Sequence, residues 1–314
     1  MSAKYEFDFM GRRRIATIFS GVLIVISLLS LAINSLQLGL DFTSGVSIRL
    51  TYSDPVNLDQ VNATLRANDY GEALVVSYGS DRDIRVILPV NENTALSDQA
   101  ARAIEVGETL ADELRQDTTS EIILSGSDFV SAKAGEELAE ESGLGLLIAL
   151  GAIMVYISVR FQFKFAVGAV AALVHDVLIT LGVFSILHIQ FDLTVLAALL
   201  AVIGYSLNDT IIVADRIREN FRRQRRGTAE ELINLSLNQT LSRTLITSGT
   251  TLMVVVVLYF IGGDAVRGFC TAMIVGIGVG TYSSIYIASA IVLWMNVSRE
   301  DLMLPVKEDI TTEG

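Results

Sequence analysis

Six long apolar segments dominate the hydrophobic pattern of this 314-residue chain. Each is long enough to cross the hydrocarbon core of a bilayer, which takes roughly 20 helical residues. Each should be α-helical, because lipid offers backbone amides no other partner. The pattern therefore predicts a polytopic α-helical membrane protein with transmembrane spans at residues 15–33, 143–160, 165–187, 193–215, 244–263 and 268–297.

In residues 34–141, between the first two spans, the hydrophobic pattern changes to the short strands and amphipathic helices of a soluble domain. In chain order, the predicted elements are strand 46–52, helix 57–68, strands 73–78 and 84–90, helix 96–115 and strand 121–124. The order β-α-β-β-α-β is that of the ferredoxin-like α+β fold. This segment contains no histidine and no phosphate-binding loop, which favours a binding or mechanical role over catalysis. A helix predicted at 131–142 would run straight into the second span.

Charge predicts the orientation of the chain in the membrane. The net charge is −12, and residues 34–141 hold 20 acidic but only 7 basic residues. Basic residues gather before the first span, between the second and third, and after the fourth. The positive-inside rule then places both termini in the cytoplasm, with residues 1–14, 216–243 and 298–314, and it places residues 34–141 in the periplasm of a Gram-negative cell. Topology and anionic lipid headgroups explain the arginine run at 222–226, so nucleic acid is not expected as a partner.

Two ionisable residues lie at matching depths in neighbouring spans. Asp209 lies in the cytoplasmic half of the fourth span, and Arg243 begins the fifth. Such residues are costly in lipid and mark either a functional pathway or a buried structural pair. Desolvation favours a protonated aspartate, whereas an approaching cation favours the ionised form. Helix movement that parts or joins Asp209 and Arg243 would thus bind or release a proton, although a static pair is the alternative.

Other intramembrane residues are predicted to support this pair or to pack the helices. The supporting polar residues are His175, Asp176, Ser206, Asn208 and Thr247. Small residues recur at every fourth position of the sixth span, which is typical of close helix packing. They are Gly268, Ala272, Gly276 and Gly280. No metal site, cofactor or enzymatic nucleophile is predicted, so protons would be the only coupling species.

Several short motifs, in this order and at these spacings, resemble one family. They are residues 7–10 (Phe-Asp-Phe-Met), 39–43 (Gly-Leu-Asp-Phe-Thr), 172–177 (Ala-Leu-Val-His-Asp-Val), 204–210 (Gly-Tyr-Ser-Leu-Asn-Asp-Thr), 215–220 (Asp-Arg-Ile-Arg-Glu-Asn) and 238–244 (Asn-Gln-Thr-Leu-Ser-Arg-Thr). Together they resemble the SecF members of the SecD/SecF family of protein-export membrane proteins. One departure is Ser44-Gly45, where the family usually has Gly-Gly.

The resemblance implies a partner, a fold type and a function. SecF pairs with SecD, each supplying six spans, and the complex resembles transporters of the resistance-nodulation-division (RND) superfamily. It works beside the SecYEG channel of the inner membrane, often with YajC, and uses the proton motive force to drive late steps of preprotein translocation and release. The aspartate and arginine implicated in proton passage in that family match Asp209 and Arg243, and another essential acid lies on SecD.

Two other functions are left open by the residues alone. One is a subunit of an RND-type small-molecule exporter, although those exporters carry larger domains outside the membrane. The other is a passive scaffold of the SecYEG channel. The proton relay distinguishes the export motor from the scaffold, because full activity of both Asp209→Asn and Arg243→Leu would favour the scaffold.

Overall fold

The computed structural model describes residues 7–42, 45–68, 70–71, 73–78, 80–88, 96–118, 120–130, 132–224 and 226–302. Within these residues, six helical segments are long and apolar enough to cross a membrane. Five of them are α1 (Arg13–Asn34), α4 (Ala132–Arg160), α5 (Phe163–Leu187), α6 (Leu193–Arg223) and α7 (Ala229–Ile261). The sixth combines α8 (Asp264–Ser283), a π-helical turn (Ser284–Ala288) and α9 (Ser289–Trp294).

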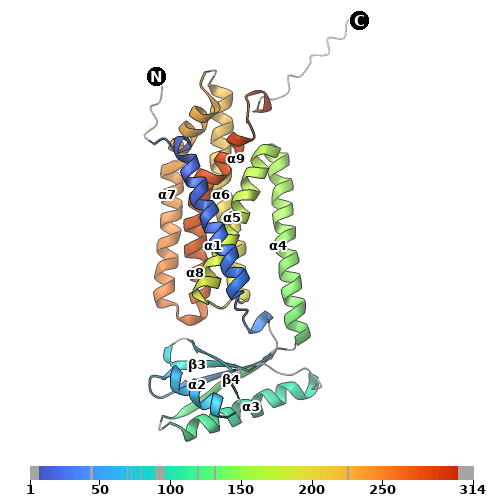
Figure 1. Ribbon diagram of the computed structural model, residues 1–314, viewed down its shortest axis with the longest axis vertical. Helices are drawn as coiled ribbons and strands as arrows, with labels where there is room; N and C mark the ends of the chain where they lie inside the picture. Colours follow the sequence, from blue (N-terminus) through green and yellow to red (C-terminus); the bar gives the residue numbers. More distant parts are fainter. Residues whose placement is uncertain are drawn as a thin grey trace.

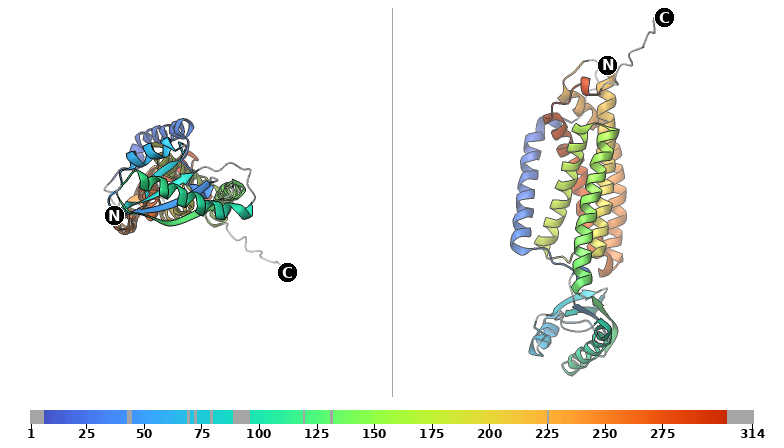
Figure 2. Two further views of the ribbon diagram at one scale, coloured as in Figure 1. Left: turned by 90° about the horizontal axis from the view of Figure 1, so that it is seen from below. Right: turned by 90° about the vertical axis from the view of Figure 1, so that its right-hand side faces the viewer.

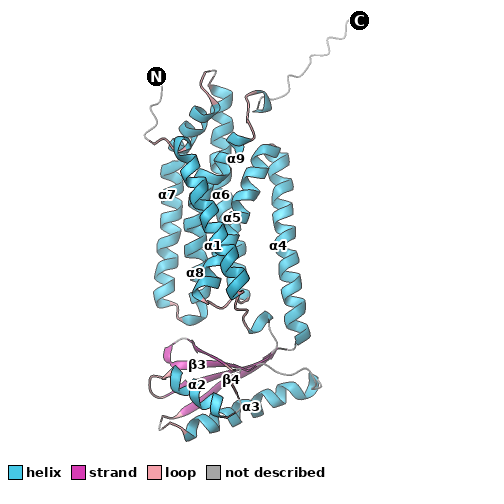
Figure 3. Cartoon of the chain, viewed as in Figure 1, coloured by secondary structure: helices cyan, strands magenta, loops and turns pink. Residues whose placement is uncertain are grey.

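The membrane helices form an elongated bundle above a small α+β domain (Figures 1 and 3). Figure 2 shows α1 on one flank of the bundle, where it packs against α5. The short 3-10 helices at the start and end of the described chain, Met10–Arg12 and Glu300–Leu302, lie at the end of the bundle away from the sheet (Figure 1). A third one, Leu40–Phe42, lies at the opposite end, beside the sheet domain.

Burial separates the central helices from the outer ones. In the most apolar stretch of α5, 56% of the residues are buried, compared with 6% for α4. Helices α6 and α8 share the centre with α5, whereas α1 and α7 resemble α4 in leaving most of their apolar side chains uncovered. Such outward apolar faces are those that lipid or a membrane partner would cover.

The sheet domain has four antiparallel strands and two helices. Its elements are β1 (Gly45–Tyr52), α2 (Leu58–Ala67), β2 (Leu74–Tyr78), β3 (Ser80–Leu88), α3 (Leu96–Gln116) and β4 (Ile122–Val130). The strand order is β2-β3-β1-β4, and both helices lie on the face away from the bundle (Figure 3). The core of the domain contains Ile48, Val86 and Leu110, because alternate strand residues and one helix stripe point to the same side.

Several helices extend beyond the boundaries that the hydrophobic pattern predicts. Helix α6 continues to Arg223, and α7 already begins at Ala229. The segment 216–243, which was predicted to hold a cytoplasmic basic loop and a helix, contains the end of α6 and the start of α7. Helix α4 is continuous from Ala132, which is the predicted direct run from the sheet domain into the second span. The π-turn that interrupts the last span was not predicted.

Residues 39–42, which follow α1, form hydrogen bonds with the turn between α5 and α6. The Gly39 amide donates to the Phe191 carbonyl at 2.8 Å, and Asp41 Oδ2 accepts from the Leu193 amide at 3.0 Å. A side chain at Gly39 would crowd this contact, because its Cβ would lie 3.3 Å from the Phe191 carbonyl oxygen. A carboxylate is well placed there, since the first amides of α6 lack helical partners. The motif thus anchors the base of the sheet domain to the bundle, and the departure at position 44 lies outside the described residues.

Candidate functional site

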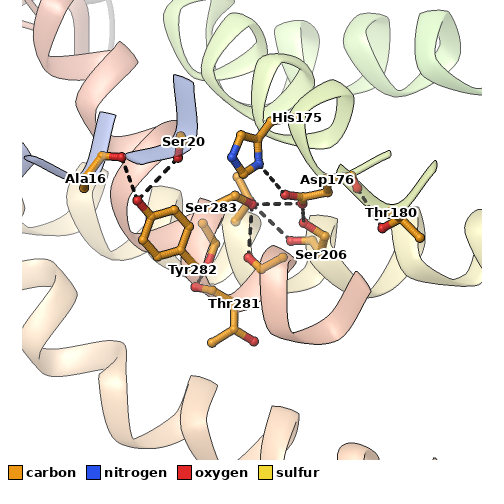
Figure 4. Close-up of polar contacts among 12 residues, drawn as sticks. Ala16, Ser20, His175, Asp176, Thr180, Ser206, Thr281, Tyr282 and Ser283 are labelled. Carbon is orange, nitrogen blue, oxygen red and sulfur yellow. Dashed lines mark hydrogen bonds and ion pairs between the residues drawn. The ribbon is translucent and has the colours of Figure 1, made fainter. Parts of the chain in front are cut away.

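A buried carboxylate on α5 joins three helices (Figure 4). Asp176 is 1% exposed, and its Oδ2 accepts hydrogen bonds from Ser206 Oγ of α6 at 2.6 Å and Ser283 Oγ of α8 at 2.8 Å. Its Oδ1 lies 2.9 Å from His175 Nδ1. A buried charge is tolerated only when it is compensated by donors of this kind. Through its hydrogen bonds with Ser206 and Ser283, Asp176 draws the three helices together.

The imidazole beside this carboxylate extends the polar cluster toward α1. The ring of His175 stacks on Tyr282 of α8, with centroids 6.4 Å apart. The Tyr282 hydroxyl donates to the Ala16 carbonyl at 2.8 Å and accepts from Ser20 Oγ at 3.3 Å (Figure 4). If Nδ1 carries the proton toward Asp176, then Nε2, which is buried and has no hydrogen-bond partner among the described residues, is left as a bare acceptor. The cluster thus spans α1, α5, α6 and α8.

A second buried carboxylate, Asp209 of α6, has far fewer donors. It is fully buried, and its Oδ2 accepts one hydrogen bond, from Ser248 Oγ of α7 at 3.3 Å. Its Oδ1 has no hydrogen-bond partner among the described residues. Ser248 Oγ in turn lies 2.8 Å from Thr281 Oγ1 of α8. Compared with Asp176, Asp209 has little to stabilise a negative charge, so it is the more suitable of the two for binding a proton.

Arg243 lies near this carboxylate but does not form an ion pair with it. Its side chain is exposed, and the ion pairs found in the described part of the chain include none between Arg243 and Asp209. Arg243 lines a cavity of about 420 Å³ between α4, α6 and α7, together with Tyr156, Arg160, Phe161, Ile211, Ile212, Asp215, Arg216, Glu219, Gln239 and Thr240. The structure thus places the two residues apart, with a polar cavity beside the arginine.

The supporting residues predicted from sequence separate into two groups. Ser206 binds Asp176, although it lies one turn from Asp209 on the same helix. Thr247 donates only to carbonyl groups of its own helix, and Asn208 lies on the exposed face of α6. The structure therefore brings Ser206 together with the His175-Asp176 pair and leaves Asn208 and Thr247 outside both carboxylate sites.

Sequence reasoning missed the contribution of α8 to these sites. Thr281, Tyr282 and Ser283 each contact one of the polar clusters, and Ser248 of α7 links Thr281 to Asp209. The available signal was a run of four consecutive hydroxyl residues, 281–284, within an apolar span, because such side chains form hydrogen bonds between membrane helices. The π-turn over 284–288 begins at the last residue of this run.

Glycines let α8 approach α6 closely enough for these contacts. The four small residues of the predicted packing face are Gly268, Ala272, Gly276 and Gly280. A Cβ at Gly280 would lie 3.0 Å from Ser206 Cβ and 3.5 Å from Asp176 Oδ2, and one at Gly276 would overlap the Val202 side chain. A Cβ at Gly268 would also crowd α6. The hydroxyls of α8 therefore reach the carboxylates because the backbones are in close contact.

No group of three or more His, Cys, Asp or Glu residues in the described ranges could hold a metal ion. The chemistry of the two sites is that of hydroxyls, carboxylates, an imidazole and a guanidinium. These groups can bind, orient and pass protons, and they can change their hydrogen bonds when a carboxylate gains or loses charge.

Six apolar helices with two buried carboxylates at their centre define a multi-pass membrane protein of a transport class. Residues 98–298 match the family model "Protein export membrane protein SecD/SecF, C-terminal", and residues 29–56 match "SecD/SecF GG Motif". The chain belongs to the SecD/SecF family of protein-export membrane proteins, in which it matches the SecF members over nearly its whole length.

Curated relatives and solved structures agree with this assignment. The protein translocase subunit SecF of Vibrio alginolyticus is 44% identical over 98% of this chain and 96% of its own length. That of Pseudomonas aeruginosa is 45% identical over 96% of this chain and 95% of its own length. A crystal structure of the translocon-associated membrane protein SecDF from Thermus thermophilus matches 94% of this chain with a TM-score of 0.82 at 35% identity. This chain spans only 39% of that SecDF chain.

Proposed function

We propose that this chain is the SecF subunit that pairs with SecD and, beside the SecYEG channel, uses the proton motive force to drive late steps of preprotein translocation and release. The observation that carries the proton-coupled part is Asp209, a fully buried carboxylate. One of its oxygens has no hydrogen-bond partner in the part of the chain that the structure describes, and the other accepts only a long hydrogen bond there. A permanently charged group would be costly there. A carboxyl group that alternates between protonated and ionised forms accounts for its place in the bundle.

Arg243 supplies the charge that decides which form of Asp209 is favoured. As it lies now, the guanidinium faces the cavity rather than the carboxylate, so Asp209 is suited to taking up a proton. Helix movement that brings Arg243 to Asp209 would stabilise the ionised form and expel the proton. One charge crossing the membrane supplies about 2.3 kcal/mol for each 100 mV of potential.

The inferred partner is a SecD subunit. The SecDF structures that this chain resembles are more than twice its length, which leaves room for a SecD part in the same assembly. The exposed face of α6, between α4 and α7, includes Asn208 and the uncovered Gly204, and a membrane helix could approach closely there. YajC, anionic lipids at the arginines of 216–226, and the moving preprotein complete the proposed set of partners.

We also propose that both ends of the chain lie in the cytoplasm of a bacterium with an inner membrane, and that the sheet domain is periplasmic and ferredoxin-like. The strand order β2-β3-β1-β4 supports that fold. The basic residues before the first span, between the second and third, and after the fourth support that side. Helix α4 joins the sheet domain to the bundle without a break. Movement of the domain can therefore be transmitted to the membrane helices.

The test uses Asp209→Asn and Arg243→Leu in vesicles that contain the complete translocase and a preprotein already partly inserted. Once ATP-driven insertion is stopped, completion of export should depend on the proton gradient in the wild-type complex and should fail in both variants. Asp215→Asn is the matched control, because this carboxylate lies exposed in the cavity rather than buried. Full gradient-dependent export by both variants, with SecD still bound, would contradict the relay and favour a passive scaffold.

A further inference from the structure

A three-residue stretch of α8 lies between the two buried carboxylates. Thr281 contacts Ser248, which donates to Asp209, and Ser283 donates to Asp176. Between them, Tyr282 binds the Ala16 carbonyl of α1 (Figure 4). One turn of α8 therefore contacts Asp176 directly, contacts Asp209 through Ser248, and also contacts α1.

The hydrogen bonds on the Asp209 side can run in two directions, since each hydroxyl has one proton to give. Thr281 Oγ1 has two acceptors at 2.8 Å, Ser248 Oγ and the Ile277 carbonyl. If Asp209 is ionised, Ser248 must donate to it and Thr281 must donate to Ser248. If Asp209 carries a proton and donates to Ser248, then Ser248 can donate to Thr281, and Thr281 turns to Ile277. The charge state of Asp209 thus determines which acceptor the Thr281 hydroxyl of α8 uses.

The Asp176 side of the stretch is held more firmly. Asp176 keeps contacts with His175 and Ser206 in addition to Ser283, all at 2.9 Å or less. Ser283 also has a second acceptor, the Gly280 carbonyl at 3.2 Å. Ser283 can therefore leave Asp176 without losing all its hydrogen bonds, whereas Asp176 retains two of its partners. Within the described residues, the ionisable group in contact with this carboxylate is His175 of α5, whose ring stacks on Tyr282 of α8. On the Asp209 side, the cation of α7 is Arg243, five residues before Ser248.

A π-helical turn directly follows this stretch. Residues 284–288 are π-helical, and Ser289 Oγ contacts the Ser284 carbonyl five residues back, at 3.4 Å. Single π-turns within α-helices concentrate at functional sites, since the extra residue can be shifted along the helix. The turn lies between residues 281–283 and α9, at the point where a rotation of these residues would be taken up.

We propose that Thr281 and Ser283 are positioning residues through which α8 couples the charge state of Asp209 to the fixed carboxylate Asp176. This inference rests on the proposed proton function of Asp209. Protonation of Asp209 reverses the Thr281–Ser248 hydrogen bonds, and the resulting rotation of residues 281–283 alters the contact between Ser283 and Asp176. The signal passes from α7 and α6 to α5 through α8, without direct contact between the two carboxylates.

The test is the infrared C=O stretch of protonated Asp209, measured on the complex with SecD in lipid vesicles and assigned by its loss in Asp209→Asn. Thr281→Val keeps the shape of the side chain but removes its hydroxyl, so the band should shift in frequency. Gradient-driven export should fall by about fivefold, the effect of one lost hydrogen bond. Thr281→Ser should restore both, and Ser283→Ala should reduce export to a similar extent. Thr271→Val is the control, because the hydroxyl of this half-buried residue donates to the Arg267 carbonyl of its own helix.

The outcomes separate this inference from the proposed function. If Asp209→Asn leaves export and the infrared spectrum unchanged, then the relay itself is wrong. If Asp209→Asn abolishes both the band and export, while Thr281→Val and Ser283→Ala behave like Thr271→Val, then the coupling through α8 is overturned and the relay stands. Should Thr281→Val fail to assemble with SecD, Ser248→Ala breaks the same link from α7, and the same shift and loss are expected.

Discussion

Ser283 of α8 donates a 2.8 Å hydrogen bond to the carboxylate of Asp176 on α5, across 107 positions of the chain. This contact, with that of Ser206, fixes the rotation of three central helices about one buried charge. The other buried carboxylate, Asp209, is not held in this way. The bundle therefore combines one firmly bound acid with one loosely bound acid, which is the arrangement expected where only one of them exchanges protons.

Removing a donor from the firmly held acid should destabilise the bundle. We predict that Ser206→Ala lowers the free energy of unfolding by about 1–3 kcal/mol, the usual effect of a lost hydrogen bond to a buried charged group. The measurement is equilibrium unfolding in mild detergent. Thr250→Ala is the control, because its exposed hydroxyl donates to the backbone of its own helix. Equal stability of the two variants would show that Asp176 does not depend on Ser206.

Two glycines of α8 that are two residues apart, and so lie on different faces of the helix, should respond differently to the same substitution. A Cβ at Gly276 would overlap Val202 of α6, whereas one at Gly278 would meet nothing within 4 Å. We predict that Gly276→Ala destabilises the protein by about 1–3 kcal/mol through overpacking. Gly278→Ala should be neutral or stabilising, since alanine is the better helix former. Thermal unfolding of the two variants compares them directly, and a harmless Gly276→Ala would mean that α6 and α8 are not in close contact.

The segment before α1 is held to α7 by two asparagines. Asn238 Oδ1 accepts from the Phe7 amide at 3.0 Å, and Asn234 Oδ1 accepts from the Met10 amide at 2.8 Å. We predict that Asn238→Ala speeds hydrogen exchange at Phe7 and that Asn234→Ala speeds it at Met10, because each substitution frees a different amide.

Each asparagine variant serves as the control for the other. Exchange measured by NMR or by mass spectrometry after proteolysis should show the two effects at separate positions. Identical acceleration at both amides in both variants would show that the segment opens as one unit, and no acceleration would show that the asparagines do not hold it.

The sheet domain should lose stability in acid through Asp83. Hydrogen bonds from Ser80 and Thr51 hold the pKa of Asp83 below its usual value. A carboxylate with a lowered pKa contributes stability above its unfolded pKa, about 3.9, and this contribution is lost as the pH falls through its folded pKa. Asp83→Asn should therefore weaken the domain at neutral pH but have less effect below about pH 4.

The measurement is denaturant unfolding of the whole chain at several pH values, in which hydrogen exchange of the β3 amides reports unfolding of the sheet domain. Asp81→Asn, at an exposed position of the same strand, is the control. A difference between Asp83→Asn and wild type that stays the same at every pH would contradict this role for the carboxylate.

The sequence was most informative about features that depend on composition along the chain. Long apolar runs predicted six helices of membrane length. Asp176 and Asp209 stood out as ionisable residues within these runs, and both are buried in the structure. Depth in the membrane could also be judged, because position along a helix is proportional to residue number. The rotation of each helix could not be judged, since it depends on packing between segments far apart in the chain.

The role of α8 shows where that limit lies. Arg243 was expected to lie at the depth of Asp209, yet Ser248, five residues further along α7, is the residue that reaches this carboxylate. Ser283 reaches Asp176 only because glycines bring α8 close to α6 and because the helix keeps its α-helical phase up to the π-turn. Neither condition can be derived from the spacing of residues within one helix.

The charge state of Asp209 under a proton gradient tests the central claim most directly. Infrared difference spectra of the complex with SecD in vesicles, recorded with and without an imposed gradient, would report it. The account predicts a protonated-carboxyl band that changes with the gradient, disappears in Asp209→Asn and persists in Asp215→Asn. A spectrum that is unaffected by the gradient, or a gradient-dependent band that is retained in Asp209→Asn, would contradict it.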